Sequence, residues 1–483
     1  MDRTGSGIPK TTALLVAWLG CVALIVTNLI QHGLWLDETH AWCLVRDSAG
    51  FADLRWNMRN EGHPWLWHLM LLPLAKSGAP VWIMQVLHGL VAVATSTLVL
   101  FRAQFPIAIR VLLVFGYFLV FEYAALARNY AVGVLLLLTF ADLTRKGRNG
   151  LAFAALLVLA HVHLWSACLV ASWAILSLFQ RQQRKAWQAL CLLLSSGIAL
   201  YCVMPAEELP YGADPSRLLL HDTYRNVGIQ LTKAFIPIPD AQAGHVWNSS
   251  LAVEAGSTIA TWAGPLILLA VVFLLPVDRR GRLHLAAGCL AILALPLLAP
   301  FLAQRYMGPL LAVFVACVWV WPAEKVIWPT KGLITGLLLL QVIGGVRMSW
   351  ICHERPFSRS RDASAYIAHR GTPVLVMRYD AAPSISAYLG KPVFLVFRQE
   401  MGSFCIWNEP NSVATMEQLT AALLAREPGP VRVVSGEALD PRALEAVGYE
   451  VTEMTRFNGS LIPREDHIVH TLEPIGATKR SPS

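Results

Sequence analysis

The chain has 483 residues, of which 55% are hydrophobic and only 14% charged, and its mean hydropathy is +0.51. Soluble domains are about 25% charged, so this composition excludes an ordinary soluble protein and predicts an integral membrane protein. The net charge of +8 does not indicate a nucleic-acid partner, because the basic residues lie in short loops between apolar runs, where they indicate membrane topology.

Apolar runs of about 18–20 residues, long enough to span a bilayer, recur from Thr12 to Met348. The first run, Thr11–Ile30, is longer than the apolar part of a signal peptide, so we expect a retained first helix. Basic clusters mark the cytoplasmic side, among them Arg3 with Lys10, Arg145–Arg148 and Arg181–Lys185. They predict a cytoplasmic N-terminus and about eleven crossings. We expect these near residues 11–31, 80–101, 108–126, 129–143, 150–162, 164–180, 187–204, 254–276, 283–303, 308–322 and 332–349.

One apolar segment, Pro64–Leu74, does not fit this alternation. It is short and carries Trp65, Trp67 and His68, side chains that suit the membrane interface. We therefore expect residues 31–79 to form one long outer-face loop with interfacial helices, although a twelfth crossing remains possible. The other segments expected at the outer face are 122–129, 161–163, 205–254, 304–307 and the chain after about 350.

Beyond residue 350 the composition becomes that of a soluble domain. Strand-like runs at 373–378, 392–397 and 431–434 alternate with helix-like runs at 362–369, 416–426 and 441–447. This pattern predicts a transmembrane domain over 1–350 and a small extracytoplasmic α/β domain over 351–483. No glycine-rich phosphate loop opens a helix there, so nucleotide binding has no support.

Two adjacent carboxylates, Asp37 and Glu38, follow the first apolar run in the segment LWLDETHAW. At the water boundary Asp37 could act as a general base or a metal ligand. The alternative is a helix-capping or solvated carboxylate, which the spacing alone favours. Glu38 has the same alternatives, and we take both residues as catalytic candidates.

A second candidate group is Glu61 and His63, which precede Pro64 in NEGHPWLWHLMLL. A carboxylate and an imidazole at this spacing could share a divalent metal, or hold a phosphate through one. An interfacial helix start explains the pattern equally well, because proline often opens a helix.

Arginine–tyrosine pairs occur at two predicted outer helix ends, as Arg128 with Tyr130 and Arg305 with Tyr306. Arginine at a membrane boundary is costly unless it snorkels or pairs with an anion. Its planar fork suits two phosphate oxygens, and two such pairs on one side favour a phosphate-bearing ligand. His161 and His163 could bind a metal, although a His-x-His pattern alone is weak evidence. The long loop 205–254 is typical of a lid or a substrate-binding element.

With these residues in place, the chain resembles the GT-C superfamily of membrane glycosyltransferases. The likeness is strongest to the bacterial family-39-like branch, related to protein O-mannosyltransferases and lipid A aminoarabinose transferases. It covers about residues 11–350 and is carried by Asp37-Glu38, Gly62-His63-Pro64, Arg128-x-Tyr130, His161-x-His163 and Arg305-Tyr306.

The resemblance implies a polytopic α-helical fold in the bacterial inner membrane. It implies transfer of a sugar from a polyprenyl-phosphate donor, with inversion, to an acceptor hydroxyl of a lipid, glycan or protein at the periplasmic face. Asp37 would be the general base, Glu61 would lie near the donor phosphate, and Arg128 and Arg305 would neutralise the departing lipid phosphate.

The sequence departs from the family pattern at one acidic position. Many relatives have a segment that would place a carboxylate at Leu126, whereas the nearest acid here is Glu122. The second acidic residue of the site and the use of a metal therefore stay open. A non-enzymatic binder or translocator of polyprenyl-linked glycans is the alternative function. A solute transporter is a third, less favoured because the polar groups gather at predicted outer ends rather than at helix midpoints.

Overall fold

The computed structural model describes residues 10–179, 186–204, 214–300, 303–325, 328–369, 371–407 and 413–476. Arg3, the basic cluster Arg181–Lys185 and the first nine residues of the predicted loop 205–254 lie outside the described residues. The chain forms two compact units. The helical unit comprises Met1–Ile30, Gly62–Trp67 and Val86–Ile351, and the sheet unit comprises Gln31–Glu61, His68–Gln85 and Cys352–Ser483. Much of the first predicted outer loop thus belongs with the C-terminal residues.

The helical unit consists of helices with short connections. They are α1 (Lys10–Gln31), α5 (Ile83–Arg102), α6 (Ile107–Val114), the π-helix η1 (Phe118–Glu122), α7 (Tyr130–Arg145), α8 (Asn149–Leu159), α9 (Leu164–Phe179), α10 (Ala186–Cys202), the 3₁₀-helix η3 (Pro215–Leu219), α11 (His221–Phe235), α12 (Leu251–Glu254), α13 (Ser257–Leu274), α14 (Arg279–Leu298), the 3₁₀-helix η4 (Gln304–Tyr306), α15 (Pro309–Val320) and α16 (Trp328–Glu354).

By length and composition, five of the described helices could cross a membrane, namely α1, α5, α13, α14 and α16. Shorter apolar helices lie at 149–159, 164–179, 186–202 and 304–320. Large apolar side chains such as Leu19 on α1 and Phe273 on α13 are exposed, as expected of surfaces that face lipid. The chain is therefore a multi-pass membrane protein, while the count of eleven crossings stays a prediction.

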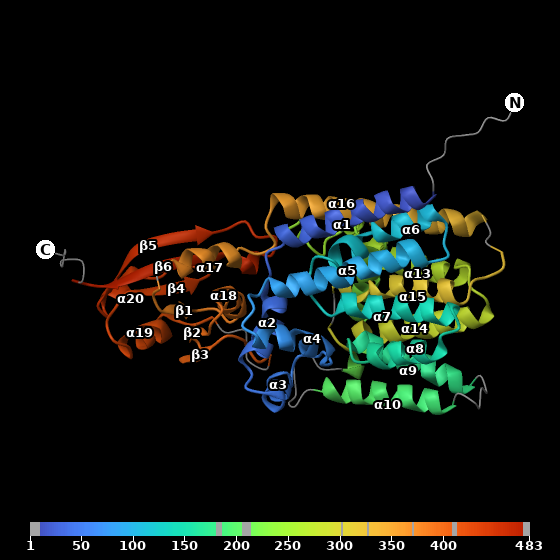
Figure 1. The fold of residues 1–483 in the computed structure, drawn as a ribbon. Helices are drawn as coiled ribbons and strands as arrows, with labels where there is room; N and C mark the ends of the chain where they lie inside the picture. The colour runs from blue at the N-terminus through green and yellow to red at the C-terminus, as the bar shows by residue number, and fades with distance from the viewer. Residues whose placement is uncertain are drawn as a thin grey trace. The chain divides into compact units, whose positions relative to one another are not determined.

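The helices of this unit pack as neighbours in a bundle. Helix α7 contacts α8 and α15, α9 contacts α10 and α14, and α11 contacts α13. Figure 1 shows α1 beside α16, and the Asn28 side-chain amide on α1 donates to Ser349 on α16 at 3.0 Å and to the carbonyl of Val120 at 2.9 Å. These polar contacts fix η1 between two long helices.

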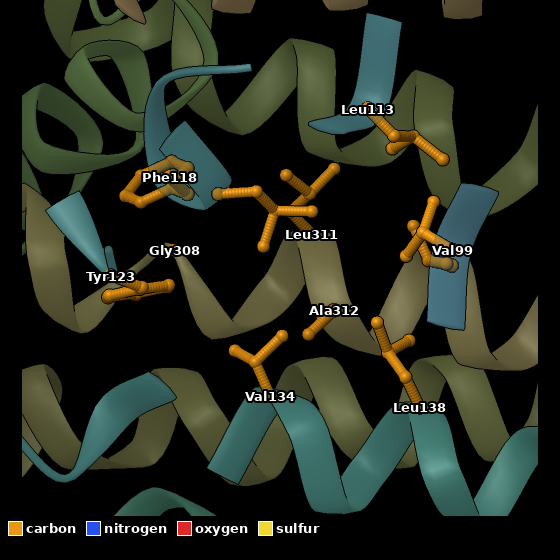
Figure 2. A pocket seen from close by; sticks show the side chains of 11 residues that line it. Val99, Leu113, Phe118, Tyr123, Val134, Leu138, Gly308, Leu311 and Ala312 are labelled. Atoms are coloured by element: carbon orange, nitrogen blue, oxygen red, sulfur yellow. The ribbon is translucent and has the colours of Figure 1, made fainter. Parts of the chain in front are cut away.

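The predicted crossing at 108–126 is interrupted. Helix α6 ends at Val114, and the chain continues through the π-helix η1 into a turn before α7 begins at Tyr130. π-Helical turns are rare and are frequent at functional sites. Figure 2 shows apolar side chains of α5, α6, η1, α7 and α15 around a cavity, with Phe118 and Tyr123 beside Gly308. The cavity has a volume of about 10 Å³. A space this small and apolar is a packing gap and holds no ligand.

The sheet unit combines short helices with a six-stranded sheet. Its elements are α2 (Leu36–Asp47), α3 (Phe51–Asn57), α4 (Leu66–Lys76), α17 (Ser360–Ala368), β1 (Val374–Val376), α18 (Ala382–Leu389), β2 (Val393–Leu395), β3 (Glu400–Gly402), α19 (Met416–Leu424), β4 (Val431–Ser435), α20 (Pro441–Glu445), β5 (Tyr449–Phe457), the 3₁₀-helix η5 (Pro463–Glu465) and β6 (His467–Pro474).

The strand order is β3-β2-β1-β4-β6-β5, with β1 parallel to β2 and β4 and the remaining pairs antiparallel. Side chains alternate along the strands, so each face has its own core. Leu375 packs in a core with Leu419 of α19 and Leu444 of α20, and Val376 packs in another with Ile367 of α17 and Ile385 of α18. Helix α2 packs on α18. The predicted small α/β domain is confirmed as a three-layer arrangement.

Candidate functional site

The helical unit brings most of the predicted phosphate-binding residues into one group, here called the phosphate cluster. Arg128 Nη2 donates to His63 Nε2 at 2.9 Å. The His63 ring lies 4.7 Å from the His163 ring, measured between centres, and the His163 ring lies 4.7 Å from that of Tyr130. Three motifs that are far apart in the sequence therefore meet.

The second arginine–tyrosine pair joins the same cluster. The Tyr306 ring lies 6.2 Å from Tyr130 and 6.4 Å from His163. The Tyr123 hydroxyl donates to the backbone carbonyl of Arg305 at 2.6 Å, and its ring stacks on Tyr130 with a centre distance of 5.4 Å. The cluster is thus continuous from His63 to Arg305.

The protonation of His163 follows from its surroundings. Burial, together with the nearby positive charges of Arg128 and Arg305, lowers the pKa of His163 to about 3. The ring is therefore neutral at physiological pH. Its Nδ1 accepts from the backbone N–H of Trp165 at 3.2 Å, so the single proton lies on Nε2. Within the described residues this buried Nε2–H has no hydrogen-bond partner.

Two side chains that the motifs did not single out complete the cluster. Glu122 is buried in η1, and its Oε2 accepts from the Tyr117 hydroxyl at 2.8 Å and from Trp247 Nε1 at 3.0 Å. The guanidinium of Arg305 lies 5.3 Å from the centre of the Trp247 ring, within cation–π range. Glu122 is the acid that sequence reasoning had noted only as displaced from the family position.

The long loop 205–254 contributes through the neighbour of Trp247. Asn248 adopts a left-handed backbone with φ 68°, a conformation that asparagine tolerates better than most residues. Its Oδ1 accepts from the backbone N–H of Gln304 at 2.8 Å, which fixes the start of η4 and so the position of Arg305. A tryptophan followed by asparagine in a loop of small residues was the only sequence signal for this role.

His161 does not join the cluster. Its Nε2 lies 3.0 Å from the hydroxyl of Ser195 on α10, and the side chain is half-buried on the other side of the turn. Burial lowers the pKa of His161 below its usual value. Its contact differs from that of His163 because residues two apart in a turn point in different directions. The predicted His-x-His pair is therefore divided, with only His163 at the arginines.

In the sheet unit, the carboxylates of the opening motif occupy the first turn of α2. Glu38 is fully buried, and its Oε2 accepts from the backbone N–H of Trp35 at 3.2 Å and lies 2.7 Å from His32 Nε2. Glu38 therefore caps the helix, which satisfies one of its orphan N–H groups. Asp37 is partly exposed. Helix capping, which was the alternative role expected for this pair, is performed by Glu38.

A third carboxylate supports the same helix end. Glu465 Oε1 accepts from the backbone N–H of Leu36 at 2.8 Å, and its Oε2 contacts the hydroxyls of Ser358 at 2.8 Å and Ser360 at 2.9 Å. Burial raises the pKa of Glu465 to about 7, against the lowering effect of these hydrogen bonds. The Ser360 hydroxyl also lies 2.7 Å from His467 Nε2, so it can pass its proton between two buried groups.

Glu61 and His63, the predicted metal pair, are each engaged otherwise. Trp407 Nε1 donates to the Glu61 carboxylate, and His40 Nδ1 lies 3.2 Å from Glu61 Oε1. His63 Nε2 accepts from Arg128, which uses the lone pair that a metal would need. No group of three His, Cys, Asp or Glu side chains within the described part of the chain could hold a metal ion. As they are hydrogen-bonded here, Glu61 and His63 do not fit a metal site.

No protein-family model and no curated protein matches the sequence. The fold is similar to the crystal structure of ArnT from Cupriavidus metallidurans bound to undecaprenyl phosphate, with a TM-score of 0.50, 13% sequence identity and 100% of both chains covered. ArnT from the same organism in the apo state gives a TM-score of 0.43 and 14% identity, covering 98% of this chain and 100% of that one. The resemblance predicted from the motifs is confirmed at the level of the fold.

Proposed function

We propose that this chain is a membrane glycosyltransferase. It transfers a sugar from a polyprenyl-phosphate donor to an acceptor hydroxyl, with inversion, at the periplasmic face of a bacterial inner membrane. The observation that carries the proposal is the phosphate cluster, in which two arginines surround the buried, neutral His163. Positive charge and hydrogen-bond donors favour sugar transfer from such a donor, because the leaving group is an anionic phosphate.

The cluster offers three kinds of stabilisation to a departing lipid phosphate. Arg128 and Arg305 supply fixed positive charge, and a guanidinium matches two phosphate oxygens at once. His163 Nε2–H supplies a neutral hydrogen bond that needs no rearrangement. Fixed donors aimed at developing charge lower the barrier most in sites from which water is excluded. The similar ArnT structure holds undecaprenyl phosphate, which supports this class of ligand.

An apolar cavity suits the lipid part of the donor. It has a volume of about 610 Å³ and lies among α6, α11, α13, α15 and α16. One end is lined by Met307 and Gly308, directly after the Arg305–Tyr306 pair, and the lining also includes Phe314 and Trp319 farther along α15. A prenyl chain is purely apolar, so its burial here would add affinity without polar contacts.

The general base is Asp37, the partly exposed member of the carboxylate pair. It takes the proton of the acceptor hydroxyl as that oxygen forms a bond to the anomeric carbon. The bond from this carbon to the phosphate oxygen breaks, and the electron pair leaves with the lipid phosphate. Attack opposite to the leaving group inverts the configuration. Glu38 acts through Asp37, because its capping of α2 holds the first turn in place.

The proposal is tested by sugar transfer from a polyprenyl-phosphate donor in reconstituted membranes. Asp37→Asn should lower the transfer rate by about 10²- to 10⁴-fold, the usual contribution of a general base, while donor binding stays intact. Arg128→Ala and Arg305→Ala should weaken binding of the polyprenyl phosphate itself. Asp222→Asn, at a side chain that is 82% exposed on α11, is the matched control and should be as active as the parent.

Wild-type transfer by Asp37→Asn would remove the base assignment. Donor binding by a parent chain that transfers no sugar would favour the non-enzymatic binder.

A further inference from the structure

The sheet unit contains a cavity of about 460 Å³ that the proposed sugar transfer does not use. It lies beyond the carboxyl ends of β1 and β4, and Met377 and Ser435 belong to its lining. From β1 the chain passes through α18 to β2 on one side, and it later returns through α19 to β4 on the other side. Such a switch point in the direction of winding is where open α/β sheets bind ligands.

The polar wall of this cavity is held in a fixed geometry. Arg378 Nε donates to Asp380 Oδ1 at 2.9 Å, and its Nη2 donates to Asp380 Oδ2 at 2.8 Å. The same Nη2 donates to the backbone carbonyl of Arg464 at 2.7 Å. Asp380 is only 5% exposed. The side chains of Arg378 and Asp380 therefore line the cavity in one fixed orientation, unlike exposed side chains, which sample several rotamers.

The charges of the lining balance. Arg378 and Arg464 carry positive charge, and Asp380 and Glu437 carry negative charge. A phosphate or another ion would meet as much repulsion as attraction. A hydroxyl group both donates and accepts, so adjacent hydroxyls can satisfy a carboxylate and a guanidinium together.

The rest of the lining is apolar. Met377, Met416 and Leu439 contribute hydrocarbon and thioether surface to the same cavity. A pyranose ring presents C–H groups on one face and hydroxyls at its rim, which matches this division. A volume of about 460 Å³ lies within the range of small-molecule sites.

We propose that the crevice beyond β1 and β4 is a second, non-catalytic binding site for an uncharged saccharide. The polar wall binds vicinal hydroxyls, and the apolar side chains contact the face of the ring. The site goes beyond the proposed sugar transfer and does not depend on it.

Gly436 provides a minimal way to disturb this site. A Cβ at this position would lie 2.9 Å from Nη1 and 3.0 Å from Cδ of Arg378. Because Arg378 is held by Asp380 and by the carbonyl of Arg464, its displacement breaks the polar wall without changing any charge. Gly429 is the matched control, since a Cβ there meets nothing within 4 Å.

The test is saturation-transfer NMR on the full chain in lipid nanodiscs. The probes are the methyl glycosides of glucose, galactose, mannose and N-acetylglucosamine. Inorganic phosphate, which has no C–H protons to detect, is added as a charged competitor. We expect ring C–H signals from at least one glycoside, a loss of at least fivefold in affinity for Gly436→Ala and Asp380→Asn, and parent-like binding for Gly429→Ala.

Asp37→Asn keeps the two proposals apart, because the glycoside signal should persist in it even when sugar transfer is lost. The second site is overturned if none of the four glycosides binds, if Gly436→Ala binds them as the parent does, or if inorganic phosphate displaces every glycoside that binds.

Discussion

At the scale of single residues, the adjacent carboxylates on α2 point in different directions, because each helical residue is rotated by about 100° from the one before. Glu38 turns into the protein, where it caps the helix and contacts His32. Asp37 keeps partial access to solvent. A motif of two acids therefore provides one group for the proposed chemistry and one that supports the helix.

Glu465 gives the sheet unit a dependence on pH. Its pKa is about 7 in the folded chain against an ordinary value of 4.5, so the folded state favours the protonated form. The contribution of Glu465 to the free energy of unfolding is therefore fully present below about pH 4.5. It falls as the pH rises and is lost once the pH passes about 7. The full change corresponds to roughly 3 kcal/mol.

Glu465→Gln should flatten this dependence, because an amide does not ionise. Thermal unfolding of the purified protein between pH 4 and 8, followed by tryptophan fluorescence, measures it. Glu417→Gln, at an exposed position in α19, should keep the slope of the parent. An equal slope in Glu465→Gln would show that another group titrates.

The residues of the candidate phosphate cluster could be predicted from the sequence where both their chemistry and the predicted side of the membrane limited the choice. His63, Arg128, Tyr130, His163, Arg305 and Tyr306 were selected in this way, and the structure joins them in one cluster. Glu122 and Trp247 could not be selected, because their meeting depends on a π-helical turn and a distant loop. Glu465 was equally hidden, since its partner Leu36 lies 429 residues away.

At the scale of elements, the interrupted segment between α5 and α7 positions the phosphate cluster. The regular apolar run at 108–126 predicted one continuous helix, but the chain breaks into α6 and η1. Hydropathy cannot detect this break, because the π-helix is as apolar as the helix it replaces. Close packing against Gly308 at the start of α15 is the tertiary contact that accompanies it.

Gly308→Ala should therefore disturb the phosphate cluster through Tyr123 and Phe118, the residues that pack against Gly308. An added Cβ would lie 2.2 Å from the Tyr123 hydroxyl and 2.4 Å from the Phe118 ring, so Tyr123 must move away from the Arg305 carbonyl (Figure 2). We expect about 1–3 kcal/mol of destabilisation from overpacking and weaker binding of polyprenyl phosphate.

The measurements are thermal unfolding and lipid-phosphate binding in the same preparation. Gly336→Ala on α16 is the control, because a Cβ there meets nothing within 4 Å. Parent-like values of both quantities in Gly308→Ala would show that this contact does not position Arg305.

At the scale of the whole molecule, the sequence predicted helices for the first 350 residues and an α/β domain after them, and both are present. Apolar runs and alternating strands are strong local signals, which explains this agreement. The division into units was less accessible, because Gln31–Glu61 and His68–Gln85 belong to the sheet unit through long-range contacts. Strands β5 and β6 were also missed. Polar residues recur along β5, many of them exposed, and the largely buried β6 carries the polar residues His467, His470 and Thr471 among its apolar ones, so neither reads as a simple apolar strand.

The predicted sidedness places the sheet unit outside the cytoplasm. It can be tested with a membrane-impermeant maleimide on intact cells after replacement of the exposed Cys191 by serine. A cysteine at the exposed position Asn458 should react, and one at Arg148, in a predicted cytoplasmic cluster, should not. The opposite pattern would reverse the topology, and with it the proposed face of sugar transfer.

The hydrogen bond from Leu36 to Glu465 also sets an order of events during biosynthesis. At about 5–20 residues per second, a ribosome needs roughly 20–90 s to travel the 429 residues between them. For that time the first turn of α2 exists without its distant acceptor. A nascent chain stopped before Pro463 should insert its helices yet keep α2 incompletely ordered, so the newly made protein acquires its proposed base in working order only after η5 has emerged and folded.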